Sequence, residues 1–379
     1  MPLRHHGGRN VKLVERPPGS ETASRGSPCR QWEEAAERMP PRRARSERVT
    51  LLDVANVLGI SAITVSRALR EPEKVSEPLR MKILCQVEQM GYVPDLAARA
   101  LASRHNGIIG VLAPALTNHA YLAIMNGIEE RVRDTDLRIQ YANTNHDPDE
   151  EYRQVKLFLS QHPAGILLTG LQDQRVSDLL ALAPCPVVQI VDVNLTFSGI
   201  AVGINHREAA VAATRHLLAC GYRRVGLIGG SRDLRAQRRH EGYALVMREA
   251  GLYDPGLVMS EHRQTSVQLG CDLMKRLLEV APDVDGVFCQ NDDLALGALF
   301  EARRAGLRVP EDFGICGYND LEFALCAEPR LTTIRVPRFE MGYRAADLII
   351  RAVNDECLPG RVIQLPFDLI QRGSTRPLA

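Results

Sequence analysis

The 379-residue sequence has no run of about 20 consecutive apolar residues, which is the length that a membrane helix needs. Its N-terminus also has no apolar segment followed by a small-residue cleavage site. The nine cysteines stand singly, without a CxxC pair, and this spacing argues against both a disulfide framework and a zinc site. We therefore expect a cytoplasmic protein that is neither exported nor inserted into a membrane.

Sequence motifs of common catalytic sites are missing as well. There is no HExxH or GxSxG motif, and "GLIGGSR" lacks both the GxGxxG spacing and a Walker lysine. The histidines that show no metal-binding spacing, and that we interpret as surface or packing residues, are His146, His162, His206, His216, His240 and His262. We accordingly expect no enzyme, no cofactor and no metal.

The length exceeds what one hydrophobic core usually serves, so two or three domains are expected. The net charge is only +1, but it is unevenly distributed. Met1 to His105 contains 18 Lys and Arg against 12 Asp and Glu, whereas the rest contains 29 against 34. A basic N-terminal part on a mildly acidic body is typical of an anion-binding headpiece joined to a sensor, although chance variation in surface charge is the alternative.

Residues 1–47 are rich in Pro, Gly, Ser and Arg and have no apolar periodicity, which predicts a disordered basic extension. Because Met39 opens "MPPRRARSERVTLLDV", the upstream residues are expected to be either a dispensable tail or absent from the translated protein.

Three helices are predicted within a headpiece at 48–94: Leu51 to Leu58, Ala62 to Leu69, and Glu77 to Met90. Ser61 and Ser76 are good N-caps, and Gly59 and Gly91 are natural stops. The apolar positions at three-to-four spacing, which should form one shared core, are Leu51, Val54, Ala55, Val57, Leu58, Val65, Leu69, Ile83, Val87 and Met90.

The first two helices and the turn "GIS" between them form a predicted helix-turn-helix, whose second helix enters the major groove of DNA. With Val65 and Leu69 in the core, the opposite face carries Ala62, Ile63, Ser66 and Arg67, while Thr64 lies at the edge within reach of phosphate. Arg67 is the candidate for guanine and Ile63 for a thymine methyl group. Thr50 and Ser61 are candidate phosphate donors. The alternative is a three-helix protein-interaction module.

Pro94 blocks continuation of the third helix, and Asp95 can cap a very short helix through Ser103. So few residues do not form a stable isolated helix, so 95–105 is predicted to be a hinge and linker. From residue 106 to 379, eight apolar strands alternate with amphipathic helices, which predicts parallel sheets covered on both faces. The expected fold is thus an all-α headpiece followed by an α/β core of two lobes, with ligands beyond the carboxyl ends of the strands.

The run "VTLLDVANVLGISAITVSRALREPEKVSEPLRMKI", followed by "EQMGYVPDLAARALASR", resembles the headpiece and hinge of the lactose-repressor (LacI/GalR) family of bacterial transcription regulators. The resemblance continues through "IGVLAPALTN", "GIEE", "NDDLALGA", "VPEDFGICGYND" and "PRLTTIRVP" and covers Val49 to the C-terminus; residues 1–47 have no counterpart. It implies a periplasmic-binding-protein-like core, a homodimer joined through its lobes, and an effector in the interlobe cleft.

The resemblance also implies that Leu101 wedges into the minor groove of operator DNA, where it would otherwise be an ordinary linker contact. The residues expected to contact DNA are Thr50, Leu51, Ser61, Ala62, Ile63, Thr64, Ser66, Arg67, Ser76, Tyr92, Ala98 and Leu101. The residues expected to bind the effector are Asn118, Gln189, Asp192, Arg239, Asn291, Asp292, Asn319 and Asp320. Arg239 corresponds to the family's ligand-gripping arginine, and Asn291 to its polar partner. A helix-surface role for Arg239, and helix-capping roles for Asp292 and Asp320, are the alternatives.

Two departures from the family pattern narrow the expected ligand and operator. Asn319 stands where sugar-binding members usually have the first of two acids, and Ala62 and Ile63 replace an aromatic residue at the start of the recognition helix. With "LTN", "VVQIVD" and "GVFCQNDDLALGA", these features are most similar to the gluconate-operon repressor branch. We expect a repressor that a sugar acid such as gluconate releases from DNA, and a dimer, since "RGSTRPLA" has no leucine heptads. The alternative is a sugar-binding protein, or a sugar-metabolising enzyme, with a helical interaction module.

Overall fold

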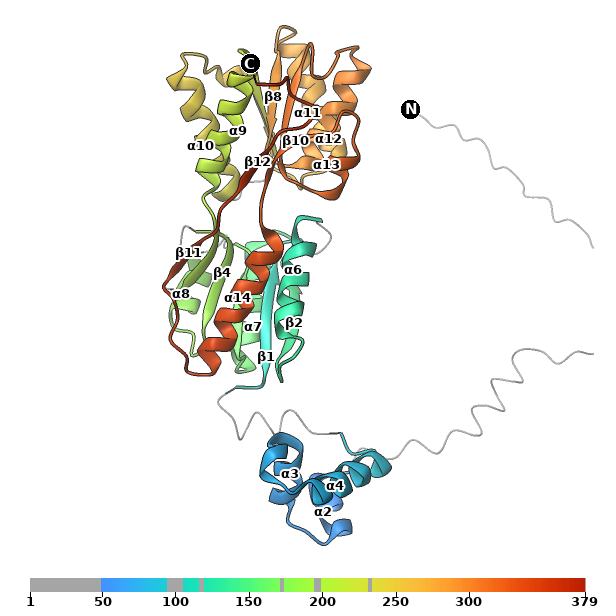
Figure 1. Cartoon of the computed structure of the whole chain (residues 1–379). Coiled ribbons are helices and arrows are strands. Elements are labelled where there is room, and N and C mark those ends of the chain that lie inside the picture. Colours follow the sequence, from blue (N-terminus) through green and yellow to red (C-terminus); the bar gives the residue numbers. More distant parts are fainter. Residues whose placement is uncertain are drawn as a thin grey trace, which may run out of the picture. The chain divides into compact units, whose positions relative to one another are not determined.

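The computed structural model describes residues 49–93, 105–115, 119–170, 174–193, 199–230 and 234–378. The chain divides between Pro94 and Asp95 into two compact units, which are described separately (Figure 1). The predicted hinge lies outside the described residues.

The headpiece consists of three α-helices and one 3₁₀ turn. These are α2 (Leu51–Leu58), α3 (Ala62–Arg70), the turn at Pro72–Lys74 and α4 (Glu77–Met90). The predicted bounds of α2 and α4 are confirmed, α3 extends one residue further than predicted, and the 3₁₀ turn was not predicted. Gly59 and Gly91 end their helices at φ 65° and 62°, where a side chain would be strained.

A membrane-spanning length is not reached by any single apolar helix in the described part of the chain. Among the described helices, α2 and α3 together have the length and apolar composition of a membrane span, but the two helices are bent by 109° relative to each other.

The headpiece core consists of Val54, Ala55, Val65, Ala68 and Ile83, with a ring of partly buried apolar residues around them. The prediction of Val57 in this core was wrong, because its side chain is 60% exposed. In α2 the inward stripe passes through positions 51, 54, 55 and 58, and position 57 projects about 120° away from it at 100° per residue.

Thr50 begins α2 with a capping box. Its hydroxyl oxygen accepts from the Asp53 amide at 3.3 Å, and the Asp53 carboxylate accepts from the Thr50 amide at 2.8 Å. Hydrogen bonds from Thr50, including one from its hydroxyl at 2.6 Å, lower the pKa of Asp53. This reciprocal arrangement satisfies backbone donors that the first helical turn leaves free.

We expect Thr50→Ala to destabilise the headpiece by about 1 kcal/mol, because the cap and its partner bond are both lost. Amide hydrogen exchange of the peptides that cover residues 49–93, measured in the full-length protein, gives the change in local stability. Ser76→Ala is the matched control, because Ser76 is the N-cap of α4 but its side chain makes no capping hydrogen bond. Equal effects of the two substitutions would contradict the assigned role of the capping box.

The larger unit contains two six-stranded sheets. Sheet A has the order β11-β5-β4-β3-β1-β2 and sheet B the order β12-β10-β9-β8-β6-β7. The strands of sheet A are β1 (Ile108–Ala113), β2 (Arg138–Asn143), β3 (Gly165–Leu168), β4 (Val187–Asp192), β5 (Ile200–Ile204) and β11 (Val362–Gln364). Those of sheet B are β6 (Val225–Gly230), β7 (Val258–Glu261), β8 (Gly286–Cys289), β9 (Gly314–Asn319), β10 (Thr332–Arg335) and β12 (Asp368–Ile370). All recorded pairings are parallel except that of β10 with β12.

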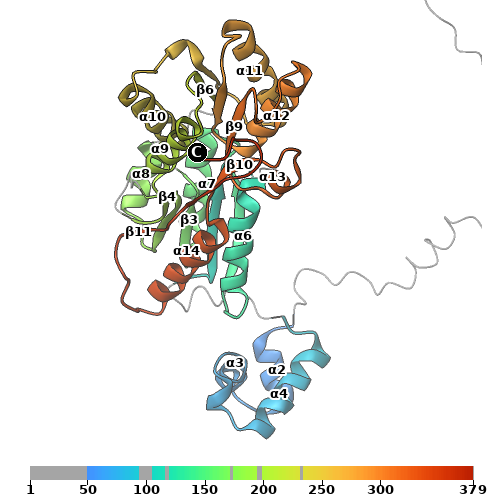
Figure 2. The same cartoon turned by 45° about the horizontal axis from the view of Figure 1, so that its top comes forward.

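Helices cover both faces of each sheet (Figures 1 and 2). Around sheet A these are α6 (His119–Val132), α7 (Pro148–Ser160), α8 (Gln174–Ala181) and α14 (Arg338–Val353). Around sheet B they are α9 (His206–Ala219), α10 (Leu234–Glu249), α11 (Val267–Val280), α12 (Asp292–Arg304) and the short α13 (Glu322–Cys326); a 3₁₀ turn spans Pro255–Leu257. The pairs α6 with α14, α9 with α10 and α11 with α12 pack most extensively.

The chain passes between the two lobes three times. It passes from β5 into α9, from β10 into α14, and from β11 into β12, each time leaving one sheet and joining the other lobe. One hydrophobic core joins the α6–α14 side of sheet A to the α9–α10 side of sheet B. The crossing segments therefore belong to packed cores and lie close to whatever is bound between the lobes.

The predicted headpiece and two-lobed α/β core are confirmed, as are all eight predicted strands of the core. Strands β5, β7, β11 and β12 and helices α8 and α13 were not predicted. The last strands read only "VIQ" and "DLI", and their strand conformation depends on neighbours that lie far away in the sequence. The antiparallel β12 pairs with the edge of an otherwise parallel sheet, which the strand–helix alternation does not indicate.

Candidate functional site

The outer surface of α3 carries short and polar side chains suited to close approach to a surface such as a DNA groove. Ile63 is 69% exposed and Arg67 is also exposed, while Thr64 and Ser66 are half-buried. Ser61 is the N-cap, with its hydroxyl oxygen accepting from the Thr64 amide at 3.1 Å and lying 2.8 Å from the Thr64 hydroxyl. An exposed helix with a free guanidinium and an exposed methyl-rich side chain is the arrangement that base reading requires.

Other residues expected at this surface are placed differently. Ala62 is partly buried against the headpiece core, so its prediction on the face opposite to the core was wrong, and Leu51 and Tyr92 also pack against that core. Ser76 is the N-cap residue of α4, but no side-chain capping bond is made. Ala98 and Leu101 lie outside the described residues.

The described headpiece is not itself basic. Residues 49–93 contain five Lys and Arg and five Asp and Glu, whereas residues 1–48 contain 11 against six. The basic excess of the N-terminal third is therefore concentrated before the first helix. The headpiece itself therefore offers individually placed cations, such as the exposed Arg67, rather than a net positive charge.

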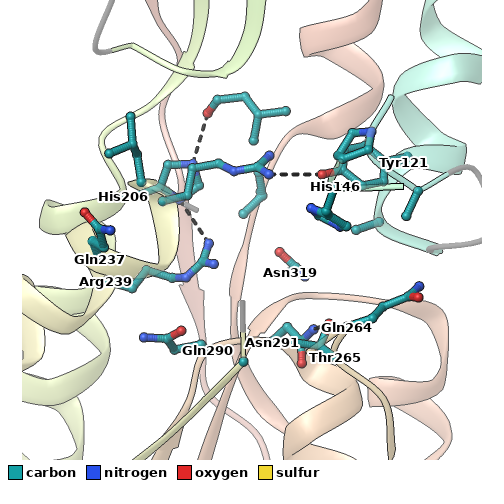
Figure 3. Close-up of a pocket in the computed structure, with 18 of the residues that line it drawn as sticks. Tyr121, His146, His206, Gln237, Arg239, Gln264, Thr265, Gln290, Asn291 and Asn319 are labelled. Atoms are coloured by element: carbon teal, nitrogen blue, oxygen red, sulfur yellow. Dashed lines mark hydrogen bonds between the residues drawn. The ribbon is translucent and has the colours of Figure 1, made fainter. Parts of the chain in front are cut away.

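A cavity of about 830 Å³ is bordered by residues from both lobes of the larger unit (Figure 3). Its lining guanidinium and imidazole side chains are Arg235, Arg239, Arg263, Arg338, His146, His206 and His262. No Asp or Glu is among the described residues that line it. Arg263 is paired with Glu261 and Asp272, which lie outside the lining, so the other three guanidinium groups are the ones that make the cavity electrostatically suited to an anion.

The structure brings three of the predicted effector residues to this cavity, namely Arg239, Asn291 and Asn319. Asn118 lies outside the described residues. Gln189, Asp192, Asp292 and Asp320 are not among the residues that line the cavity.

Gln189 and Asp192 are buried behind the cavity in β4. The Gln189 side-chain amide donates to the Asp192 carbonyl at 3.2 Å, and the Asp192 carboxylate lies 3.3 Å from Nε of Arg238. Both side chains therefore support the strand end rather than face the cavity.

Asp292 and Asp320 are bound within the protein, so direct effector contact does not fit their positions, and neither is the cap of the helix that follows it. Asp292 is fully buried, and its carboxylate accepts from the Thr333 hydroxyl at 2.6 Å and the Leu321 amide at 2.8 Å. Asp320 pairs with Arg335 and Arg372. The cap of α12 is Asn291, whose Oδ1 accepts from the Leu294 amide at 2.9 Å.

Burial raises the pKa of Asp292 to about 6, against hydrogen bonds from Thr333 and Leu321 that favour its charged form. The folded protein thus holds a proton on this group at pH values where the unfolded chain has released it. Between pH 7 and pH 5 this group makes the free energy of unfolding increase as the pH falls, by at most about 1.4 kcal/mol per pH unit.

We expect Asp292→Asn to remove this contribution to the pH dependence of stability. The test compares urea unfolding at pH 5 and pH 7, and the same pH dependence in both proteins would contradict the assignment.

Two lining arginines connect separate parts of the fold. Arg235 of α10 donates from Nη1 to the Thr169 carbonyl at 3.0 Å and from Nη2 to the Tyr121 hydroxyl at 3.1 Å, and both acceptors belong to the other lobe. The bond to Tyr121 is one of those drawn in Figure 3. Arg338, at the start of α14, donates to the Asn319 carbonyl at 2.7 Å, and burial lowers its pKa to about 10. These bonds hold the cavity walls in register.

Arg239 has the most available guanidinium for an anion. Its Cζ lies 4.9 Å from the centre of the Tyr318 ring, and its Nη1 lies 3.4 Å from Nδ1 of His206. Its Nε is buried and has no hydrogen-bond partner among the described residues. Because the residue lines the cavity, a carboxylate bound there would accept hydrogen bonds from the terminal nitrogens of this guanidinium. Figure 3 shows the side chain extending between His206 and Gln290.

The sequence interpretation missed most of the basic lining groups. His206 had been assigned to the surface or to packing, although it directly follows the strand–turn "AVGIN", a position where ligand residues of α/β sheets concentrate. Arg235 and Arg338 stand at or near helix starts and carry no motif of their own. No group of three or more His, Cys, Asp or Glu side chains in the described ranges could hold a metal ion.

Comparison with known proteins places both parts of the chain. Residues 50–95 match the model of bacterial regulatory proteins of the lacI family, and residues 214–375 match a periplasmic binding protein-like domain. The HTH-type transcriptional regulator GntR of Pseudomonas aeruginosa is 38% identical over 86% of this chain and 96% of its own length. GntR of Escherichia coli K12 is 35% identical over 87% of this chain and 99% of its own length.

Solved structures agree with these matches. Transcription regulator GntR from Chromobacterium violaceum has a TM-score of 0.68 at 34% identity and covers 71% of this chain and 99% of its own. The lac repressor dimer bound to operator has a TM-score of 0.78 at 25% identity over 87% of this chain and 100% of its own. With a helix-turn-helix headpiece, a two-lobed core and relatives of this similarity over nearly their full length, the chain belongs to the LacI family of bacterial regulatory proteins and is a DNA-binding transcription regulator.

Proposed function

We propose that the protein is a repressor whose operator binding is weakened by a small sugar acid, with gluconate as the first candidate. The observation that carries the proposal is the lining of the cavity, where four arginines and three histidines stand without a lining carboxylate among the described residues. The hydroxyls of a neutral sugar would accept hydrogen bonds from these groups, whereas a carboxylate would in addition be attracted by the excess of positive charge.

The rest of the lining suits the hydroxyl groups of such an acid. Gln237 and Gln290 line the cavity with amides, and the Thr265 hydroxyl oxygen accepts from Nδ2 of Asn291 at 2.7 Å, which leaves the Thr265 hydroxyl hydrogen to donate (Figure 3). Asn319 stands where neutral sugar-binding relatives carry an acid, so a negative charge that would repel a carboxylate is missing. Among the structural relatives, one is a CelR–cellobiose complex and one holds bound ribose, which supports a saccharide-sized ligand.

Arg67 and Ile63 are the proposed base-reading residues, and Thr50 and Ser61 the proposed phosphate contacts. The proposed assembly is a homodimer that binds a two-fold operator, with Ala98 and Leu101 of each hinge at its centre; a lac repressor dimer on operator DNA is the supporting relative. By linkage, the effector weakens DNA binding by the same factor by which DNA weakens effector binding.

Fluorescence anisotropy of a labelled DNA fragment from upstream of the protein's own gene tests the function. Full-length protein is titrated onto the fragment at fixed salt, followed by gluconate, other sugar acids and neutral sugars. We expect sequence-dependent binding that gluconate or a related acid reverses and that the neutral sugars leave unchanged. Tight binding that no acid alters would disprove the ligand class, and weak, salt-sensitive binding alone would disprove the regulator.

A further inference from the structure

His206 lies where the chain first passes from one lobe to the other. It is the first residue of α9, two residues after β5 ends, and its side chain is 1% exposed. Its imidazole contacts both lobes. Nε2 lies 3.1 Å from the carbonyl oxygen of Val191 in β4, and Nδ1 lies 2.8 Å from the hydroxyl of Tyr318 in β9 and 3.4 Å from Nη1 of Arg239 (Figure 3).

These partners fix how the ring is protonated. A carbonyl oxygen only accepts, so Nε2 must carry a hydrogen; a guanidinium only donates, so Nδ1 must be an acceptor. This pattern assigns Nε2 as the donor to Val191 and Nδ1 as the acceptor from Tyr318 and Arg239. Nε2 thus contacts the lobe of sheet A and Nδ1 the lobe of sheet B.

The Val191 carbonyl is held in an unusual orientation. Val191 has a φ of 86°, which is strained for a β-branched residue. Its strand partner is Gly203, where a Cβ would lie 2.4 Å from the Val191 carbonyl carbon and 2.5 Å from its oxygen. Only glycine at 203 leaves room for this peptide, and the bond from His206 is a contact that holds the strained conformation in place.

Ligand binding would act directly on this arrangement. A carboxylate that binds Arg239 draws its guanidinium toward the cavity. The contact of Nη1 with Nδ1 of His206 is the longest of the three ring contacts, at 3.4 Å, and is therefore the first to be lost. Nδ1 then loses its contact with Arg239 and keeps its hydrogen bond with the Tyr318 hydroxyl. The ring is free to follow Tyr318, and its bond to the strained Val191 peptide changes.

We propose that His206 is a coupling residue that transmits occupancy of Arg239 in one lobe to the strained end of β4 in the other. The inference rests on the proposed function, since it concerns the regulation of the same cavity. His206 is a positioning residue here, and the effect of its loss is on the coupling between effector and DNA rather than on either affinity alone.

Two conservative substitutions separate the tasks of the ring nitrogens. His206→Asn places an amide near Nδ1 but cannot reach Val191, and His206→Gln can reach Val191 but provides no acceptor at Nδ1. For each variant, the Kd for operator DNA is measured with no gluconate and with saturating gluconate. We expect operator affinity without gluconate to stay within about twofold of the parent, and the ratio of the two Kd values to fall at least threefold, as loss of an ordinary hydrogen bond implies. An unchanged ratio at saturation in both variants would overturn the proposal.

A second readout needs no ligand. Tyr318→Phe removes only the hydroxyl that accompanies Nδ1, and it lies in the opposite lobe from β4. Hydrogen exchange of the peptide that covers residues 187–193 is expected to become roughly 2- to 10-fold faster in this variant and in His206→Asn. If the parent protein ignores gluconate, the proposed ligand is wrong, and this exchange measurement alone decides the coupling role. Unchanged exchange in both variants would refute that role for any ligand.

Discussion

Arg239→Gln is expected to produce a repressor that binds its operator normally and no longer releases it on addition of gluconate. Arg239 lines the cavity and, unlike Arg263, is paired with no carboxylate among the described residues, so the carboxylate of the effector has most to gain there. Removing one partner of a desolvated, hydrogen-bonded charge pair costs about 2–5 kcal/mol, so gluconate affinity should fall by at least roughly 30-fold. Isothermal titration calorimetry gives the effector affinity, and anisotropy gives operator release.

The matched control is Arg248→Gln in the same helix. Arg248 lies against the Tyr253 ring, with its Cζ 4.3 Å from the ring centre, and it does not line the cavity. The substitution removes the same charge from α10. It should leave gluconate affinity within a factor of about two, because salt screens the charge of an exposed arginine that does not line the cavity. A similar loss in both variants would show that general charge, rather than the Arg239 contact, attracts the effector.

The architecture was predictable because local signals agreed with the long-range ones. Gly59 and Gly91 stop their helices in the left-handed conformation that glycine favours, and Thr50 and Ser61 start theirs with side-chain caps. Continuous apolar strands such as "GVFC" can bury all their side chains only in a sheet that is covered on both faces. Each of these features lies within a few residues of the helix or strand that it determines, so the sequence pattern alone locates that element.

The cavity was less predictable because its properties arise from groups distant in sequence. Asn291 and Asp292 are adjacent, yet the first lines the cavity while the second is fully buried and bonded to Thr333 and Leu321. Asn291 is the extended N-cap of α12 and Asp292 is its first helical residue, so the change of backbone conformation between them directs one side chain to the cavity and the other into the core. Likewise, only pairing with Gly203 explains why Val191 adopts a φ that places its carbonyl beside His206.

The charge distribution adds a constraint on DNA binding. The described headpiece has no net charge, so we expect phosphate attraction to depend on individual basic side chains within it and on the basic residues that flank it in the sequence. Affinity and discrimination should then depend on different residues. Substitutions in α3 should change which sequence is preferred, and removal of charge elsewhere should change mainly the dependence on salt.

Arg67→Ala is expected to reduce affinity for the specific operator by about 1–3 kcal/mol, or roughly 5- to 150-fold, and to relax the preference at one guanine. Arg67 is exposed on α3, while the neighbouring Arg70 donates from Nη2 to the Ser66 hydroxyl at 2.5 Å. Arg70→Ala removes the same charge from the same helix and is therefore the control. This substitution should weaken binding to specific and non-specific DNA alike. The number of counterions released on binding, which sets the salt dependence, should fall by about one.

The measurement is anisotropy with the operator, with operators that carry a substitution at each guanine in turn, and with unrelated DNA of equal length. If Arg67 reads a guanine, the Arg67→Ala protein loses its discrimination at that position only, and the operator variant costs it no further affinity. If Arg67→Ala and Arg70→Ala reduce binding to all of these fragments equally, both arginines contact phosphate, and the base reading must come from other exposed side chains of α3, of which Ile63 is the most exposed apolar one.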